Sequence, residues 1–227
     1  KAPSSIFANL VVVMAPDYPA CRSGWHDRAR YSKRVPEINA PSAFVAALDS
    51  LRGHSFRSEI HIVQIPPPKR IAPWAVALQA EINDSPSMDP DHYRGNARFV
   101  LLHDPEGQTA WDGTFRIVCY ASAPVDREIG DDPMLSEVAW AWLTDALNAH
   151  EAEYHNLTGT VTRLYNETFG GSSLLSSHTE VELRASWSPE YSDVSAHLQA
   201  WAEFASDACG LGPAGVSALP LRLQVLE

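Results

Sequence analysis

Cysteine is scarce in this sequence of 227 residues. Its three cysteines, Cys21, Cys119 and Cys209, lie far apart and form no C-x-x-C pair. They are too few and too scattered for a disulfide framework or a zinc site. We therefore expect reduced cysteines in a cytoplasmic protein, where a buried thiol serves as a small apolar side chain.

Long apolar runs and positive charge are also in short supply. No run approaches the ~20 apolar residues that a membrane-spanning helix needs. The chain has 17 Lys and Arg against 28 Asp and Glu, for a formal charge of −11. A field of that sign repels phosphate backbones and anionic lipid surfaces. Nucleic-acid binding is therefore disfavoured, and we expect no membrane partner.

Complete catalytic motifs are missing as well. There is no G-x-S-x-G elbow, no H-E-x-x-H pair and no phosphate-binding loop. The glycine-rich stretch from Phe169 to Ser173 is not followed by a helical pattern, so we interpret it as a strand connection longer than a tight hairpin. His150 and His155 straddle a predicted helix end, which favours solvated side chains over metal ligands. We expect no metal and no cofactor.

The apolar residues that are present recur with two periods. Spacing of three and four predicts helices from Pro41 to Gly53, from Asp132 to His150 and from Asp193 to Cys209. Alternation predicts six strands: Ser58 to Ile65, Trp74 to Ile82, Arg98 to His103, Trp111 to Ser122, Gly159 to Phe169 and Thr179 to Trp187. Between them we expect a polar loop from Asn83 to Asn96, a turn from Asp104 to Gly107 and an acidic loop from Asp126 to Asp132.

The order of these elements contains no β-α-β alternation. It favours an α+β fold, with an antiparallel sheet of about six strands and three main helices packed on it. We divide the chain into an N-terminal arm (1–40), a single α+β domain (41–211) and a C-terminal tail (212–227). The N-terminal arm carries the densest basic cluster, between Arg22 and Arg34.

Several stretches are distinctive as a set. They read KRIAPWAVAL from Lys69, RFVLLHDPEGQ from Arg98, WDGTFR from Trp111, GTVTR from Gly159, FGG from Phe169 and EVELRASW from Glu180. Together they resemble the bacterial family catalogued as domain of unknown function 3000 (DUF 3000), from about Pro41 to Leu211. The resemblance implies a bacterial cytoplasmic protein, but it brings no known activity, cofactor or catalytic residue.

One candidate ligand site surrounds the predicted turn after Arg98 to His103. His103 and Asp104 suit a general base with its orienting carboxylate, and Gln108 and Trp111 are close in sequence. The competing and favoured interpretation is ordinary turn chemistry, since Asp-Pro-Glu-Gly is a good turn sequence.

Arginines in the predicted strands give a second candidate. Arg98, Arg116, Arg163 and Arg184 would bind a carboxylate or phosphate if their side chains shared a face. The favoured alternative is pairing with the neighbouring glutamates of the sheet, Glu167, Glu180 and Glu182.

The helix from Asp132 to His150 carries more apolar residues than one narrow face can hold. If Trp142 and Val138 face the core, then Trp140, Leu143 and Leu147 form a second apolar stripe. That stripe either meets a partner or is covered by other parts of the chain, such as the N-terminal arm.

The hypothesis that these observations favour is a non-enzymatic binding or adaptor domain whose partner is another protein or a second copy. A rival hypothesis is a small-molecule enzyme or ligand sensor with a pocket around His103, Asp104, Trp111 and the strand arginines. A third is an accessory factor in RNA processing, which depends on the basic N-terminal segment.

Overall fold

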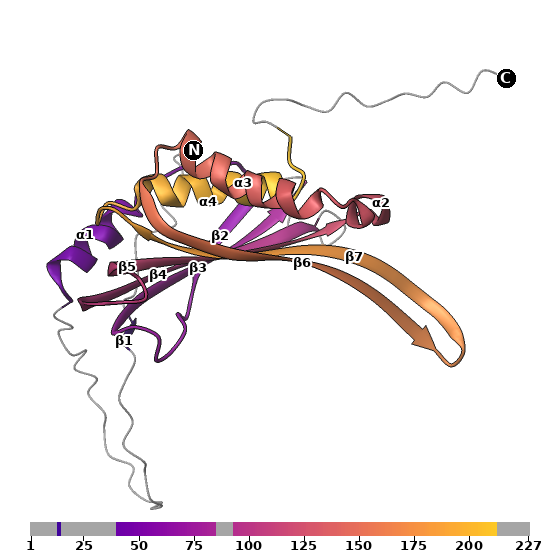
Figure 1. Cartoon of the computed structure of the whole chain (residues 1–227), viewed down its shortest axis with the longest axis horizontal. Helices are drawn as coiled ribbons and strands as arrows, with labels where there is room; N and C mark the ends of the chain where they lie inside the picture. Colours follow the sequence, from indigo (N-terminus) through magenta and orange to yellow (C-terminus); the bar gives the residue numbers. More distant parts are fainter. Residues whose placement is uncertain (1–12, 15–39, 85–92, 213–227) are drawn as a thin grey trace, which may run out of the picture.

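Two long helices lie side by side across one face of an antiparallel sheet in the computed structural model (Figure 1). The structure describes residues 13–14, 40–84 and 93–212. Most of the predicted N-terminal arm and of the C-terminal tail, with Cys21, therefore lie outside the described residues. The fold is α+β, as the order of apolar periods predicted.

The sheet has the strand order β1-β3-β4-β5-β7-β6, with β2 also paired to β3. Its strands are β1 (Val13–Met14), β2 (Ile60–Ile65), β3 (Trp74–Asn83), β4 (Tyr93–Gln108), β5 (Gly113–Val125), β6 (Tyr154–Gly170) and β7 (Ser173–Pro189). β1 and β2 share one edge of β3 end to end, because β2 pairs with residues 77–82 and β1 with residues 74–75. At the other end of the sheet, β6 pairs with β7.

The helices are α1 (Ser42–Ser50), α2 (Arg127–Asp131), α3 (Leu135–Ala149) and α4 (Ser195–Ala208). α4 is the most deeply buried, with Leu198, Trp201 and Phe204 fully enclosed. Trp201 packs on Phe99 of β4, with ring centroids 5.7 Å apart. The main core therefore lies between the helix layer and the residues of the strands that alternate toward it.

A smaller apolar cluster lies on the opposite face of the sheet. It consists of Ala72, Ala75, Leu102 and Trp111, with Val100 packed against it. Leu102 stands between Leu101 and His103 in β4, and both neighbours point to the helix side. The sheet is thus apolar on both faces at this end, which explains why β3 and β4 hold long runs of buried residues.

Several predicted boundaries were wrong. The turn between β4 and β5 lies at residues 109–112 and not at Asp104 to Gly107, which form an irregular bulge within β4 between the paired residues His103 and Gln108. The predicted loop from Asn83 to Asn96 is too long at its C-terminal end, since β4 begins at Tyr93. The predicted acidic loop contains the short helix α2.

The connection between β6 and β7 is also shorter than predicted. Gly170 pairs with Ser173, which leaves a loop of two residues. Gly171 has φ 62°, the left-handed sense that the first position of a type II′ hairpin loop requires. The two strands consequently run on past the rest of the sheet as a single hairpin (Figure 1).

The inward face of α3 differs from the predicted one. Leu143 and Leu147, assigned to a second stripe, are fully buried in the core, whereas Val138 is exposed. Trp140 is partly buried and packs over Gly159 of β6, where it fills the space that a side chain would take. The stripe is therefore covered within the domain, and Leu143 and Leu147 are not available to a partner.

Candidate functional site

The residues predicted around His103 do not gather at one place. His103 lies on the helix side of β4, buried between the rings of Phe44 and Phe115 at centroid distances of 5.7 and 4.2 Å. Its Nδ1 donates to the carbonyl of Thr114 at 3.0 Å. Burial lowers the pKa of His103, although that hydrogen bond and Asp104 oppose the shift. A neutral imidazole enclosed by two aromatic rings is a core residue without access for a substrate.

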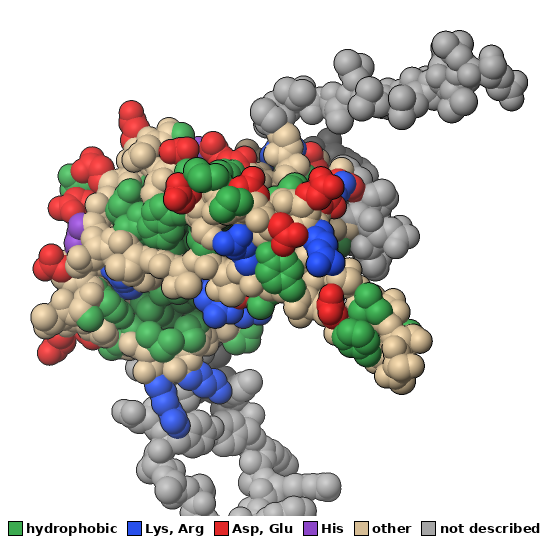
Figure 2. Space-filling view, turned by 45° about the vertical axis from the view of Figure 1, so that its right-hand side comes forward, with side chains coloured by type: hydrophobic (Ala, Val, Ile, Leu, Met, Phe, Trp, Pro, Cys, Tyr) green, Lys and Arg blue, Asp and Glu red, His purple; other side chains and the backbone are tan. Residues whose placement is uncertain are grey.

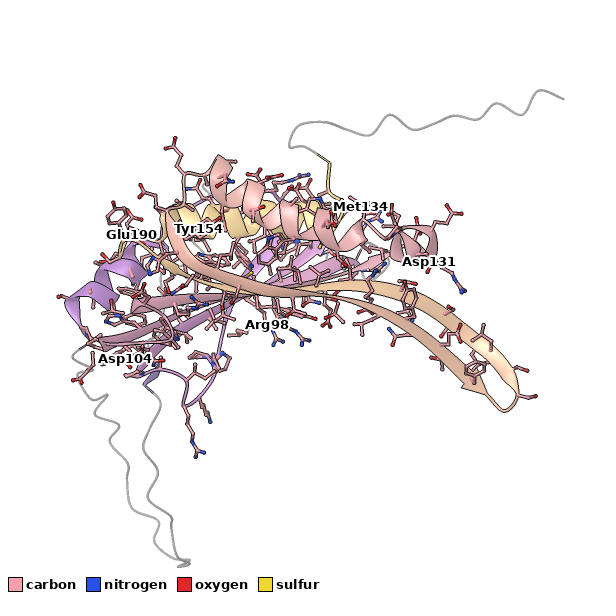
Figure 3. The ribbon with its side chains drawn as sticks, in the orientation of Figure 1. Arg98, Asp104, Asp131, Met134, Tyr154 and Glu190 are labelled. Atoms are coloured by element: carbon pink, nitrogen blue, oxygen red, sulfur yellow. The ribbon has the colours of Figure 1, made fainter. Side chains whose placement is uncertain are left out.

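Asp104 holds the bulge of β4 in shape. Its carboxylate accepts hydrogen bonds from the backbone N–H of Glu106 and from Gln108 Nε2, both at 3.1 Å. Consecutive strand residues point to opposite faces, so His103 and Asp104 do not form a catalytic pair. Asp104 lies near one end of the sheet, far from Asp131 at the other (Figure 3).

Trp111 and Arg116 are brought together by Ser188 on the face opposite the helices. Ser188 Oγ donates to the Trp111 carbonyl at 2.5 Å and accepts from Arg116 Nη1 at 3.2 Å. Arg116 also donates to the carbonyl of Asn156 at 3.0 Å and to the Oγ of Ser186 at 2.8 Å. Burial lowers the pKa of Arg116. Its guanidinium thus makes four hydrogen bonds that join β5 to β6 and β7, and Ser188 extends this network to the β4–β5 turn.

The remaining strand arginines do not form one cationic strip. Arg98 and Arg184 share the face away from the helices, on either side of Tyr120, but Arg163 lies on the other face. Arg98 projects from the face away from the helices and donates to Gln79 (Figure 3). Arg184 contacts Glu182 at 2.6 Å and lies over the ring of Tyr120. Arg163 lies on the helix side, where it donates to the carbonyls of Gly130 and Asp132. The favoured alternative, glutamate pairing, holds for Arg184 alone among these, and within one strand.

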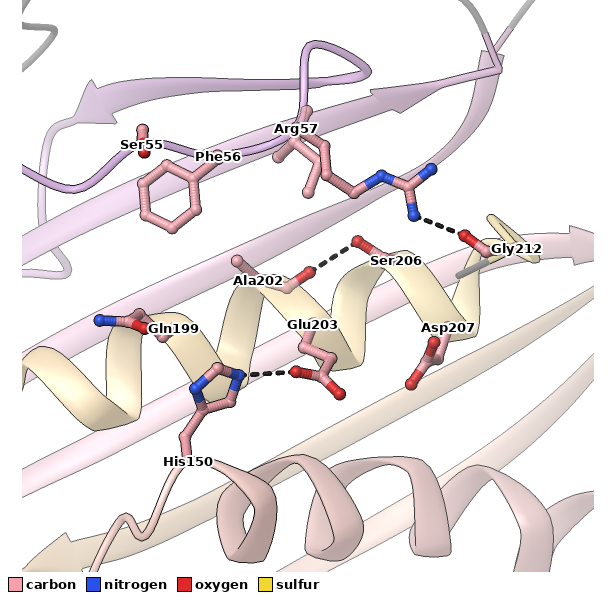
Figure 4. Close-up of a pocket in the computed structure, with 11 residues that line it drawn as sticks. Ser55, Phe56, Arg57, His150, Gln199, Ala202, Glu203, Ser206, Asp207 and Gly212 are labelled. Carbon is pink, nitrogen blue, oxygen red and sulfur yellow. Dashed lines mark hydrogen bonds and ion pairs between the residues drawn. The ribbon is translucent and has the colours of Figure 1, made fainter. Parts of the chain in front are cut away.

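A pocket of about 460 Å³ lies beside α4, where the sequence pattern indicated nothing (Figure 4). Its polar wall includes Arg57, His150, Glu203 and Asp207, and Phe56 contributes an apolar side. His150 Nε2 contacts Glu203 Oε2 at 2.6 Å, and Arg57 Nη1 donates to the Gly212 carbonyl at 2.6 Å. Burial raises the pKa of Asp207, and the charge of Glu203 adds to this effect.

Glu203 and Asp207 are one helical turn apart on α4, and the other groups come from the α1–β2 connection and the end of α3. The pocket can admit a small molecule, but its histidine and arginine are already bonded within the protein. Within the described ranges, no cluster of three or more His, Cys, Asp or Glu side chains is placed to hold a metal ion.

The projecting end of the β6–β7 hairpin is the least expected part of the surface. Every residue from 167 to 178 is exposed. We call this end of the hairpin the arm, as distinct from the predicted N-terminal arm. Phe169 is 60% exposed, Leu174 52% and Leu175 68%. Phe169 and Leu174 are cross-strand partners and share a face, while Leu175 leans over Gly170. Figure 2 shows hydrophobic side chains on the surface of this hairpin.

The arm is nearly free of charge, with Glu167 and His178 as its sole titratable side chains. Its length could not be read from alternation, because Ser and Gly occupy half of its twelve positions. The visible signal was the run Phe169-Gly170-Gly171, whose apolar residue next to a two-residue loop is compatible with a hairpin tip.

No helix in the described part of the chain is long and apolar enough to cross a membrane. Comparison with curated proteins and with solved structures found no similar protein. The family model described as a protein of unknown function (DUF3000) matches residues 40–217, and the chain therefore belongs to the DUF3000 family.

Proposed function

We propose that this protein is a non-enzymatic binding domain and that the arm is the element that contacts its protein partner. The observation that carries this proposal is the exposure of Phe169, Leu174 and Leu175 on a hairpin beyond the sheet. A two-stranded hairpin alone is marginally stable in water. Burial of apolar area yields about 25 cal/mol per Å², so a partner that covers these side chains gains affinity from each of them.

The rival hypotheses have less support. The residues of the supposed pocket around His103 point to both faces of the sheet and bond to neighbouring residues, so they do not converge on one site. His103 Nε2 has no hydrogen-bond partner among the described residues, but it is enclosed in the core and not open to a substrate. The RNA-processing hypothesis depends on residues 1–40, nearly all of which lie outside the described residues. An arm with three exposed apolar side chains and no Lys or Arg suits a protein surface better than a phosphate backbone.

Photo-crosslinking tests the proposal. A photoreactive phenylalanine analogue is placed at Phe169 in the full chain, and at Tyr191 as a matched control, because Tyr191 is equally exposed at 62% but lies in the β7–α4 connection. After irradiation in the native cells, we expect a discrete adduct from position 169 alone. Position 169 giving no more adduct than position 191 would overturn the proposal.

A second variant guards against nonspecific capture. Leu174→Ser combined with Leu175→Ser should abolish the adduct at position 169 while changing the free energy of unfolding by less than about 0.5 kcal/mol, because exposed side chains contribute little to stability. An adduct that persists in this variant would argue against binding through the apolar arm. The mass of the adduct separates a second copy from a different protein.

A further inference from the structure

Between Thr158 and Thr168, where its pairing with β7 is regular, the outer edge of β6 lacks the features that normally protect a sheet edge. Natural edges are kept short, or carry prolines and several charges, because an unpaired strand invites pairing with another chain. β6 has 17 residues and pairs with β7 alone among the described strands. From Leu157 to Thr168 it contains no proline and four threonines, and its charged residues are Arg163 and Glu167. Such a strand is suited to accept another strand.

The two charges on this edge lack partners of opposite sign. Arg163 donates to two backbone carbonyls, and neither Arg163 nor Glu167 takes part in an ion pair within the described residues. Both lie on the helix-side face, since Arg163 is paired in register with Val181 and Glu167 with Ser177. Alternation places Val161, Tyr165 and Phe169 on that same face.

From this pattern we infer that the partner of the arm is a second copy of the chain, joined through antiparallel pairing of the two β6 strands about a two-fold axis at Tyr165. The inference rests on the proposed function and specifies its partner. With the axis at Tyr165, Arg163 of each copy stands opposite Glu167 of the other, and Val161 stands opposite Phe169. Opposite charges and apolar pairs placed in this way stabilise an antiparallel ladder.

No other register matches these charges. An axis at Arg163 or at Glu167 would place like charges directly opposite each other, and an axis at Leu164 or Asn166 would leave both charges facing uncharged residues. The two-fold arrangement uses the same surface on both copies, as symmetric dimers do.

The register also accounts for the length of the arm. Residues 160–170 of one copy would lie along residues 170–160 of the other. Each arm, which projects past its own sheet, then runs beside the part of the other β6 strand that the helices cover. Phe169 is thereby placed against Val161 and loses part of its exposure to water.

Sedimentation analysis of the full chain over a range of concentrations tests the inference. We expect the wild type to have twice the chain mass of 24.9 kDa. Glu167→Arg places two arginines opposite each other at both pairs and should weaken the dimer on the order of tenfold or more. Combining it with Arg163→Glu should restore the dimer, because the charges are exchanged but remain complementary.

Crosslinking tests the register without a change of charge. Tyr165 donates to the Gly130 carbonyl of α2 at 2.7 Å, so the fold of its cysteine variant is checked as well. Tyr165→Cys should form a disulfide-linked dimer on mild oxidation, since residue 165 meets its own copy at the axis. Thr168→Cys, which lies three positions from the axis and stands opposite Thr162 of the other copy, should not. Circular dichroism checks that each variant is folded.

A monomeric wild type at every concentration would overturn this inference, and so would a dimer indifferent to Glu167→Arg or crosslinked equally well through position 168. None of these results would remove the proposed function if position 169 captured a different protein in cells. A lack of any adduct at position 169 would instead count against both.

Discussion

His197 should make this protein less stable in mild acid. Its side chain is buried on α4, and its Nδ1 accepts a hydrogen bond from Trp187 Nε1 at 3.1 Å. An imidazole that accepts on one nitrogen is neutral. Burial lowers the pKa of His197 from 6.5 to about 4, and the charge of Asp193 and a hydrogen bond with the Glu153 backbone oppose this shift without cancelling it.

Because the pKa of His197 is lower in the folded protein than in the unfolded chain, acid destabilises the fold. The unfolded chain binds the proton more tightly than the folded protein does, so the stability is complete above pH 6.5 and declines as the pH falls toward 4. One pKa unit corresponds to about 1.4 kcal/mol. This one side chain should therefore remove about 2 kcal/mol of the free energy of unfolding by pH 5 and about 3 kcal/mol by pH 4.

Urea unfolding followed by circular dichroism, from about pH 7.5 down to the lowest pH at which the chain stays folded, measures this loss. The control is His197→Asn, which keeps an acceptor for Trp187 but cannot be protonated. Carboxylates titrate in both proteins, so the difference between the two pH profiles isolates His197. Profiles that run parallel would refute the reasoning.

Three further changes have defined outcomes. A Cβ at Gly159 would lie 2.4 Å from Trp140 Cζ3 and 2.7 Å from the Arg184 carbonyl. Gly159→Ala should therefore lower the free energy of unfolding by about 2 kcal/mol, and full recovery on adding Trp140→Leu would show that the carbonyl contact does not matter. Arg116→Met leaves two serine hydroxyls and two carbonyls without their donor. It should lower the free energy of unfolding in urea by about 3 kcal/mol, whereas the control Arg98→Met should lower it by less than about 0.5 kcal/mol. Burial raises the pKa of Cys119 and of Cys209 to about 12, so in a Cys21→Ser background no thiol should react at about pH 8 before unfolding; rapid labelling of the native protein would contradict this burial.

The spacing of apolar residues and the positions of Gly and Pro predicted the fold class, the strand pairs and the three long helices. They could do so because apolar residues recur at the positions that face the core. The inward face of α3 could not be predicted in the same way. Its apolar residues cover two adjacent stripes, and the choice between them depends on how α3 packs on β6, where Gly159 admits the ring of Trp140. Turn chemistry was misleading for Asp104 to Gly107, since the pairing of Gln108 with Gly113 moves the reversal five residues onward.

The candidate site was harder to predict than the fold. His103 continues the alternation of Phe99 and Leu101, so its burial was foreseeable, but its polar side chain drew a functional interpretation instead. Arg116 gives no local sign that Ser186 and Ser188 will satisfy it. The arm was missed because serine and glycine obscure the alternation of a strand. Gly171 was the one residue there that indicated a two-residue hairpin loop.

The end-to-end sharing of the β3 edge by β1 and β2 gives the sheet two ends of different character. At the β3 end of the sheet, the outer edge is formed by β2, which has six residues and is followed by Pro66, Pro67 and Pro68. This short edge offers few consecutive N–H donors to an incoming strand. We therefore expect the sheet to extend through β6 and not through β2. An assembly grown by joining like edges would stop at two copies rather than continue as a fibre.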